Sequence, residues 1–161
     1  MNKKIIRYLN KNISSLSNSN ILIFGGTGQI GQAIVEELIY LNAHIILAVR
    51  DENKAYNLIN RLKEKYPKSN IDLVLFDLSC VLSLDKLNLK DLNITNVIIN
   101  SAVDSKNFEY SYMVNCLMPY QIIKRFKGVN TIITSSISYK KMILKIIILF
   151  IKESLCSYAI V

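Results

Sequence analysis

The stretch ILIFGGTGQIG at residues 21–31 constrains the fold of this chain more than any other. Four apolar residues lead into Gly25, Gly28 and Gly31, which lie three apart, although the chain has only five glycines. A short continuous apolar run is typical of a strand buried on both faces of a parallel sheet. Apolar residues at helical spacing follow from Ile30 onward, so the sequence predicts a strand, a glycine turn and a helix in succession.

Such a turn is the setting in which a dinucleotide pyrophosphate lies at a helix N-terminus. We expect Gly25 to allow the tight turn out of the strand. Gly28 should let the backbone approach a phosphate without an intervening Cβ, and Gly31 should let the helix pack closely on the sheet. Glycines also serve purely structural turns. The position at the first strand-to-helix junction of a βαβ pattern is what favours dinucleotide binding here.

Strand and helix patterns alternate along the rest of the chain. Further strands are expected at 44–49, 71–78, 96–102 and 130–136, and helices at 29–41, 52–65 and 109–126, with a weakly helical or looped segment at 83–93. This alternation predicts an α/β fold, a Rossmann-like doubly wound parallel sheet that is incomplete at its C-terminus. We assign residues 1–19 to an N-terminal lead-in segment and 20–161 to an NAD(P)-binding domain, within which 142–161 form an atypical apolar tail.

Composition narrows the classes of partner. The formal net charge is +8, but the lysines are scattered, which favours a solvated surface and no nucleic-acid partner. Cys80, Cys116 and Cys156 lack metal-ligand spacing and His44 is the only histidine, so no metal site is predicted. Reduced thiols, and a basic N-terminus without an apolar core, favour a cytoplasmic protein with no secretory signal.

The choice of cofactor depends on the end of the second expected strand. Arg50 follows directly after that strand, and a cation there favours a ribose 2′-phosphate, hence NADP. Asp51 lies 20 residues after Gly31 and keeps NAD as the alternative, because a carboxylate there would accept hydrogen bonds from a ribose 2′-hydroxyl. Asp51 could instead simply cap the next helix. The sequence therefore favours NADP over NAD.

An ordered set of short motifs resembles the short-chain dehydrogenase/reductase family. The glycine spacing of GGTGQIG is similar to that of the extended or atypical branch. The later motifs are VLFDLS at 74–79, IINSAV at 98–103, VNCLMPY at 114–120 and ITSS at 133–136. They follow in the family's order over about residues 20–136. The resemblance implies an oxidoreductase that acts on an alcohol or carbonyl of unknown identity with a nicotinamide dinucleotide.

The resemblance also implies two groups of site residues. In the catalytic group, Ser136 would polarise the substrate oxygen, Asn115 would support the proton relay and Lys152 would hold the nicotinamide ribose. The cofactor-binding group comprises Gly25, Thr27, Gly28, Gln29, Ile30, Gly31, Arg50, Asp77, Leu78, Asn100 and Ala102. The chain departs from the family pattern at Ser101, Val103 and Met118.

The family's catalytic tyrosine is not found. It would stand one helical turn before Lys152, where this chain has Ile148. Tyr120 and Lys124 have the right spacing but precede the expected serine strand, and we interpret them as coincidence. Two interpretations stay open: an oxidoreductase that is truncated or disturbed in its last residues and inactive in this form, or a non-catalytic dinucleotide-binding module or degenerate fragment.

The apolar tail at 142–161 has the length of a membrane-spanning helix. Lys145, Lys152 and Glu153 lie within it, however, and each would cost about 2–3 kcal/mol near the middle of a bilayer. A buried or dimer-forming helix is therefore favoured over a membrane anchor. Because the expected helices at 109–126 and 142–155 would expose apolar residues in a monomer, the sequence indicates a homodimer.

Overall fold

The computed structural model describes residues 16–87, 89 and 92–134. Its centre is a five-stranded sheet in the order β3-β2-β1-β4-β5, and every neighbouring pair is parallel. The strands are β1 (Asn20–Phe24), β2 (His44–Val49), β3 (Ile71–Leu75), β4 (Asn96–Ile99) and β5 (Asn130–Ile133). The helices are α2 (Gln29–Tyr40), α3 (Glu52–Lys65), α4 (Leu82–Lys86), α5 (Phe108–Tyr112), the π-helical segment η3 (Met113–Leu117) and α6 (Met118–Arg125). The α/β, Rossmann-like fold is confirmed.

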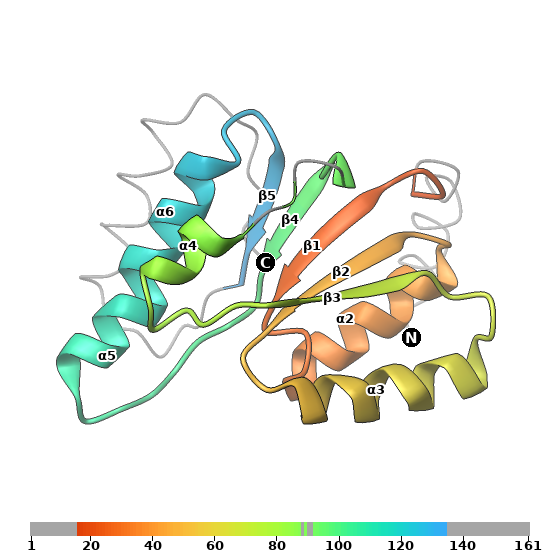
Figure 1. Ribbon diagram of the computed structural model, residues 1–161, viewed down its shortest axis with the longest axis horizontal. Coiled ribbons are helices and arrows are strands. Elements are labelled where there is room, and N and C mark those ends of the chain that lie inside the picture. Colours follow the sequence, from red (N-terminus) through yellow and green to blue (C-terminus); the bar gives the residue numbers. More distant parts are fainter. Residues whose placement is uncertain (1–15, 88, 90–91, 135–161) are drawn as a thin grey trace, which may run out of the picture.

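Helices cover both faces of the sheet (Figure 1). Successive side chains of a strand point to opposite faces, so the central strands β1, β2 and β4 contribute to two apolar cores. Ile21 and Ile23 of β1 pack in the core that contains buried residues of α2 and α3. Leu22 and Phe24 pack in the second core, which contains buried residues of α4 and α6. Burial on both faces explains why β1, β2 and β4 read as continuous apolar runs.

The chain changes the direction in which it adds strands between β3 and β4. The first three strands extend the sheet one way from β1, and the chain then returns to place β4 on the other side of β1. Neighbouring loops diverge at such a switch point and leave a crevice beyond the carboxyl ends of the strands. Phe24 and Ile99 are the last paired residues of β1 and β4. Gly25 and Asn100 therefore stand at the switch point.

Three strands end earlier than their sequence patterns predict. The strand expected at 71–78 ends at Leu75, the strand expected at 96–102 ends at Ile99, and the strand expected at 130–136 ends at Ile133. After β3, the Oδ1 atom of Asp77 accepts hydrogen bonds from the amide and hydroxyl groups of Ser79, at 2.8 and 2.7 Å. A short polar side chain that bonds to nearby backbone in this way competes with strand pairing.

The helix expected at 109–126 extends from Phe108 to Arg125, with η3 between α5 and α6. Pro119 follows Asn115 by four residues and has no N–H to donate to the Asn115 carbonyl. The missing donor is the physical reason for a π-helical turn at this point. π-helical turns inside α-helices are often found at functional sites.

Several expectations concern residues outside the described part. Ser136, Lys152 and the tail at 142–161 are among them, and only 16–19 of the lead-in segment are described. Within the described ranges, no helix combines the length and apolar character needed to cross a membrane. In the same ranges, no group of three or more His, Cys, Asp and Glu side chains is arranged to hold a metal ion.

Candidate functional site

Gly25 lies at the switch point, directly after β1. Its φ angle is +80°, a conformation that side chains with a Cβ rarely adopt. A Cβ at this position would lie 2.7 Å from the carbonyl oxygen of Asn100. The Asn100 amide donates to the Phe24 carbonyl at 2.9 Å, so β1 and β4 remain bonded up to this turn. Gly25 is therefore required by the turn itself, as its expected role states.

Gly31 allows a close approach inside the turn. A Cβ there would lie 2.1 Å from the Gly25 carbonyl oxygen and 2.8 Å from the Cα atom of Gly26. Backbone atoms cannot yield to such a contact without moving the turn. Gly31 thus lets the first turn of α2 approach the backbone of Gly25 and Gly26, which directly follow β1.

Gly28 differs from both, because nothing in the described chain requires a glycine there. Its φ angle is −74° and its ψ angle is 167°, which other residues adopt readily. Apart from its chain neighbours, the only atom of the described residues within 4 Å of an added Cβ is the Gly25 carbonyl oxygen, at 3.4 Å. A Cβ would therefore occupy open space at the start of α2, where a ligand could otherwise approach the backbone.

The N-terminus of α2 is suited to an anion. Gly28 is its N-cap residue, no side chain caps the helix, and its first turn contains no acidic residue. The amides of Gln29, Ile30 and Gly31 belong to the first turn, where a helix has no acceptors of its own. The macrodipole adds a partial positive charge at this end. The spacing of Ile30 predicts a position on the apolar face of the helix, but Ile30 is 65% exposed beside the turn.

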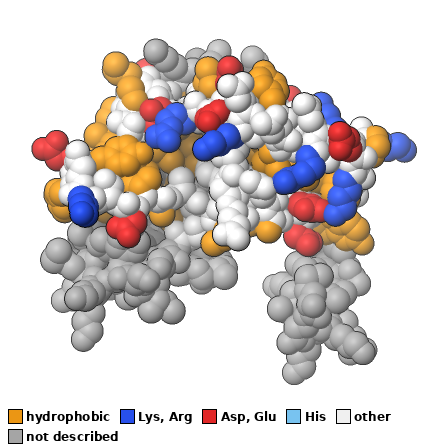
Figure 2. Space-filling model, turned by 90° about the horizontal axis from the view of Figure 1, so that it is seen from below, with side chains coloured by type: hydrophobic (Ala, Val, Ile, Leu, Met, Phe, Trp, Pro, Cys, Tyr) orange, Lys and Arg blue, Asp and Glu red, His pale blue; other side chains and the backbone are white. Residues whose placement is uncertain are grey.

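A cavity of about 620 Å³ lies beside the glycine turn, between the ends of β2 and β3. Its lining comprises Thr27, Arg50, Asp51, Glu52, Asn53, Lys54 and Leu75. The Oδ1 atom of Asp51 accepts a hydrogen bond from the Lys54 amide at 3.1 Å and caps α3. The lining contains two cationic and two acidic side chains, and Figure 2 shows both charge types intermixed on the face seen from below.

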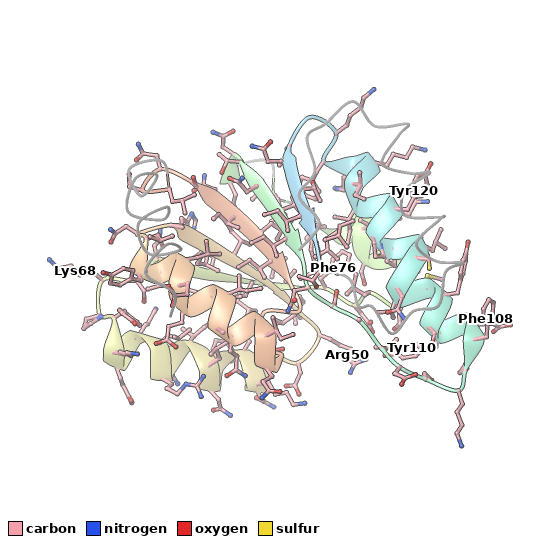
Figure 3. The ribbon with its side chains drawn as sticks, turned by 180° about the vertical axis from the view of Figure 1, so that it is seen from behind. Arg50, Lys68, Phe76, Phe108, Tyr110 and Tyr120 are labelled. Atoms are coloured by element: carbon pink, nitrogen blue, oxygen red, sulfur yellow. The ribbon has the colours of Figure 1, made fainter. Side chains whose placement is uncertain are left out.

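Arg50 extends from the end of β2 toward α5 (Figure 3). Its Nη1 atom donates a hydrogen bond to the Tyr110 hydroxyl at 3.2 Å. The hydrogen bond to Tyr110 is the main cause that raises the pKa of the Arg50 guanidinium, and electrostatic interactions with Tyr110 and with the Asp77 carboxylate add to it. No motif marks Tyr110 in the sequence, and 60 residues separate it from Arg50, so its contact with Arg50 is not predictable from local patterns.

The remaining residues expected to bind the cofactor lie at the carboxyl ends of β3 and β4. Asp77 begins the turn after β3, and Leu78 packs against the core of that face. The Oδ1 atom of Asn100 accepts from the Thr134 hydroxyl at 2.9 Å, and Ala102 is exposed. Among described atoms, the buried Oγ of Ser101 has no hydrogen-bond partner, and an unsatisfied buried hydroxyl costs about 1–3 kcal/mol.

Asn115, expected in the catalytic group, lies in η3. Its Oδ1 atom accepts from the Val103 amide at 2.9 Å, and its Nδ2 atom donates to the Val103 carbonyl at 2.8 Å. The side chain thus ties the helix to the loop that follows β4. Ser136 and Lys152 lie outside the described residues, so the structure does not test whether these three residues come together.

The fold and the glycine turn define an α/β protein of the dinucleotide-binding architecture. A family model described as "Polysaccharide biosynthesis protein" matches residues 21–114, which is more than half of the chain. The chain belongs to this family, an extended family of the short-chain dehydrogenase/reductase type, and the resemblance stated from the motifs is confirmed. The match includes the glycine turn, Arg50, the ends of β3 and β4, and η3 as far as Val114.

Solved structures share the fold. The bulky-bulky ketone specific alcohol dehydrogenase from Comamonas testosteroni has a TM-score of 0.62 and 20% identity, over 75% of this chain and 55% of that one. The MalC reductase/Diels-Alderase from Malbranchea aurantiaca has a TM-score of 0.69 and 21% identity, over 82% and 62%. An alcohol dehydrogenase from Thermococcus sibiricus, complexed with 5-hydroxy-NADP, has a TM-score of 0.63 and 17% identity, over 74% and 58%. The chain thus spans little more than half the length of these structures.

Proposed function

We propose that this chain binds a nicotinamide dinucleotide, NADP(H) in preference to NAD(H), and serves the oxidation of an alcohol or the reduction of a carbonyl. Gly28 is the observation that carries the proposal. Gly25 and Gly31 are needed for folding, whereas the packing of the described residues gives no reason for a glycine at 28. A bound pyrophosphate supplies that reason, because a Cβ would separate it from the backbone amides.

The surrounding groups fit the same ligand. The uncapped start of α2 offers amide donors to the phosphates, and exposed Ile30 offers apolar contact next to them. The cavity beside the turn has room for an adenosine ribose, with Leu75 as an apolar wall. The Ser101 hydroxyl needs a partner at the end of β4. These features support a dinucleotide that crosses the switch point from β3 toward β4.

The preference for NADP rests on Arg50 and Asp51. One carboxylate oxygen of Asp51 already accepts the hydrogen bond that caps α3. Asp51 is therefore less suited to accept a hydrogen bond from a ribose 2′-hydroxyl. Arg50 uses one donor for Tyr110 and has further N–H groups for a 2′-phosphate. Because Glu52 also lines the cavity, we expect a moderate preference for NADP over NAD.

In the proposed reaction, the nicotinamide would supply or accept a hydride when bound. Ser136 would polarise the substrate oxygen, Lys152 would hold the ribose, and Asn115 would keep the loop after β4 in place. From the family's description, we expect the substrate to be a hydroxyl-bearing or carbonyl-bearing sugar used in polysaccharide biosynthesis. The alternative function is dinucleotide binding without catalysis, which the isoleucine at position 148 favours.

The first experiment measures thermal unfolding of the full chain with NADPH, with NADH and without ligand. We expect NADPH to raise the midpoint more than NADH at equal concentration, since a ligand stabilises the state that binds it. If neither raises the midpoint, the proposal is wrong. Turnover is then measured with a panel of sugar alcohols and carbonyl compounds. Binding without turnover would support the non-catalytic alternative.

We further propose a cytoplasmic homodimer. Phe108 and Tyr112 of α5 stack at 6.1 Å between ring centroids and are 78% and 48% exposed, so this helix presents apolar surface. Burial of such surface favours association. Light scattering with size-exclusion chromatography tests the assembly, and a monomer at micromolar concentration would contradict it.

A further inference from the structure

We propose that Tyr110 is a specificity-determining residue, which positions the Arg50 guanidinium for the 2′-phosphate of NADP. The inference rests on the proposed function and deepens it. Arg50 lines the cavity beside the glycine turn, while Tyr110 is not among the described residues of that lining. Tyr110 therefore acts through Arg50, as a positioning residue.

The contact joins two elements on opposite sides of the switch point. Arg50 follows β2, and Tyr110 lies on α5, which follows β4. The hydrogen bond from Nη1 of Arg50 to the Tyr110 hydroxyl is 3.2 Å long, and Figure 3 shows the two residues next to each other. Arg50 is exposed, so without this bond its long side chain would sample many rotamers in solvent. Holding it in place before binding lowers the entropic cost of capturing a phosphate.

Tyr110 is itself held in place. The Asn107 side chain caps α5 and accepts from the Tyr110 amide at 3.0 Å. The Ser111 hydroxyl donates to the Ser105 carbonyl at 3.2 Å, which ties the same turn to the preceding loop. Tyr110 is half-buried, unlike the exposed Arg50. The hydroxyl therefore offers Arg50 a fixed partner.

The partner of Arg50 is a hydroxyl and not a carboxylate, and this difference affects how Arg50 can bind a phosphate. Asp51 caps α3 next to Arg50, and Asp77 lies close enough to act on the Arg50 charge. A carboxylate partner would neutralise the guanidinium and compete with a phosphate for it. A neutral hydroxyl holds the guanidinium without neutralising it and uses only one of its donors, so the others can form a forked pair with phosphate oxygens.

The test compares the Tyr110→Phe variant with wild type by calorimetric titration of two adenosine fragments. The fragments are 2′,5′-ADP, which carries the 2′-phosphate, and 5′-ADP, which lacks it. Loss of a hydrogen bond that orients a charged group should weaken 2′,5′-ADP binding about three- to tenfold. Binding of 5′-ADP should not change. Tyr112→Phe is the matched control, because it removes a hydroxyl from the same helix, and it should affect neither fragment.

Arg50→Gln provides the second variant. It should abolish the preference for 2′,5′-ADP, and Tyr110→Phe added to it should have no further effect, because the two residues act on the phosphate as one unit. Equal weakening of both fragments by Tyr110→Phe, or no change in either, would overturn the inference. Tighter binding of 2′,5′-ADP would also overturn it, since the hydroxyl would then compete with the phosphate. If wild type binds 5′-ADP without preferring 2′,5′-ADP, only the inference and the NADP preference fail; if it binds neither fragment, the proposed function fails as well.

Discussion

Gly25, Gly28 and Gly31, three of the four glycines in the turn, give the sharpest prediction, because substitution of Gly28 should impair binding and substitution of the other two should impair folding. In Gly28→Ala, the new Cβ would meet only the Gly25 carbonyl oxygen, at 3.4 Å. Alanine is a poorer N-cap than glycine, but it also lowers the entropy of the unfolded chain by a comparable amount. The free energy of unfolding should therefore change by less than about 1 kcal/mol.

Gly31→Ala should behave differently. Its Cβ would lie 2.1 Å from a backbone oxygen, and the resulting displacement should cost about 2–4 kcal/mol, in the upper range for overpacked sites. Gly25→Ala adds the cost of a positive φ to a 2.7 Å contact and should be destabilised similarly. For a chain of this length, such losses lower the unfolding midpoint by about 5–15 °C.

Gly28→Ala, which should reduce stability least, should reduce the affinity for the dinucleotide most. A methyl group between the pyrophosphate and the amides of α2 should weaken charge-assisted hydrogen bonds worth about 1.5–3 kcal/mol, which corresponds to a loss of affinity of about ten- to a hundredfold. Thermal unfolding gives the stability of Gly28→Ala and Gly31→Ala, and titration with NADPH gives the affinity of Gly28→Ala. The reasoning is refuted if Gly28→Ala binds NADPH like wild type, or if it is destabilised as much as Gly31→Ala.

Three further changes test the supports of the site. Asn115→Ala removes both hydrogen bonds to the Val103 backbone and should cost about 1–3 kcal/mol in a thermal melt, whereas an unchanged midpoint would show that the contact contributes little. Asp51→Ala removes the cap of α3 and should cost about 1 kcal/mol, while Asp51→Asn should retain most of it. The pKa of Glu36 is lowered mainly by its hydrogen bond with Lys65, so this pair stabilises the fold above the unfolded pKa and ceases to do so as pH falls through the folded pKa. Unfolding measured from about pH 6 to about pH 3 should therefore show wild type losing its advantage over Glu36→Gln, and a difference independent of pH would contradict the assignment.

The elements that surround the glycine turn could be predicted closely from the sequence. The expected strand at 44–49 and helix at 52–65 match β2 and α3, and the helix expected at 29–41 ends one residue earlier, at Tyr40. Periodicity works here because each element buries a face against the sheet, so its apolar spacing records its geometry. It fails at the strand ends: β3 ends at Leu75 and the Asp77 side chain bonds to Ser79 within a segment that still reads as a strand.

The parts of the site that depend on long-range contacts could not be predicted in this way. Ile30 has helical spacing yet is 65% exposed, because spacing alone does not record whether another element covers the first turn of α2. The pairing of Arg50 with Tyr110 joins side chains 60 positions apart, which no local pattern records. The π-helical turn is an intermediate case. Pro119, four residues after Asn115, signals a missing backbone donor, although the sequence alone does not show how the helix adapts.

The position of Asn115 limits how it can contribute to a reaction. Both polar atoms of its side chain are bonded to the Val103 backbone, so the side chain cannot pass a proton without giving up one of these bonds. Val103 directly follows Ala102, one of the residues expected to lie along the cofactor. The structure therefore favours a positioning role, in which Asn115 holds the loop after β4 against the helix. In that case Asn115→Ala should weaken dinucleotide binding together with stability, and a variant that kept full affinity while losing turnover would instead indicate a direct part in proton transfer.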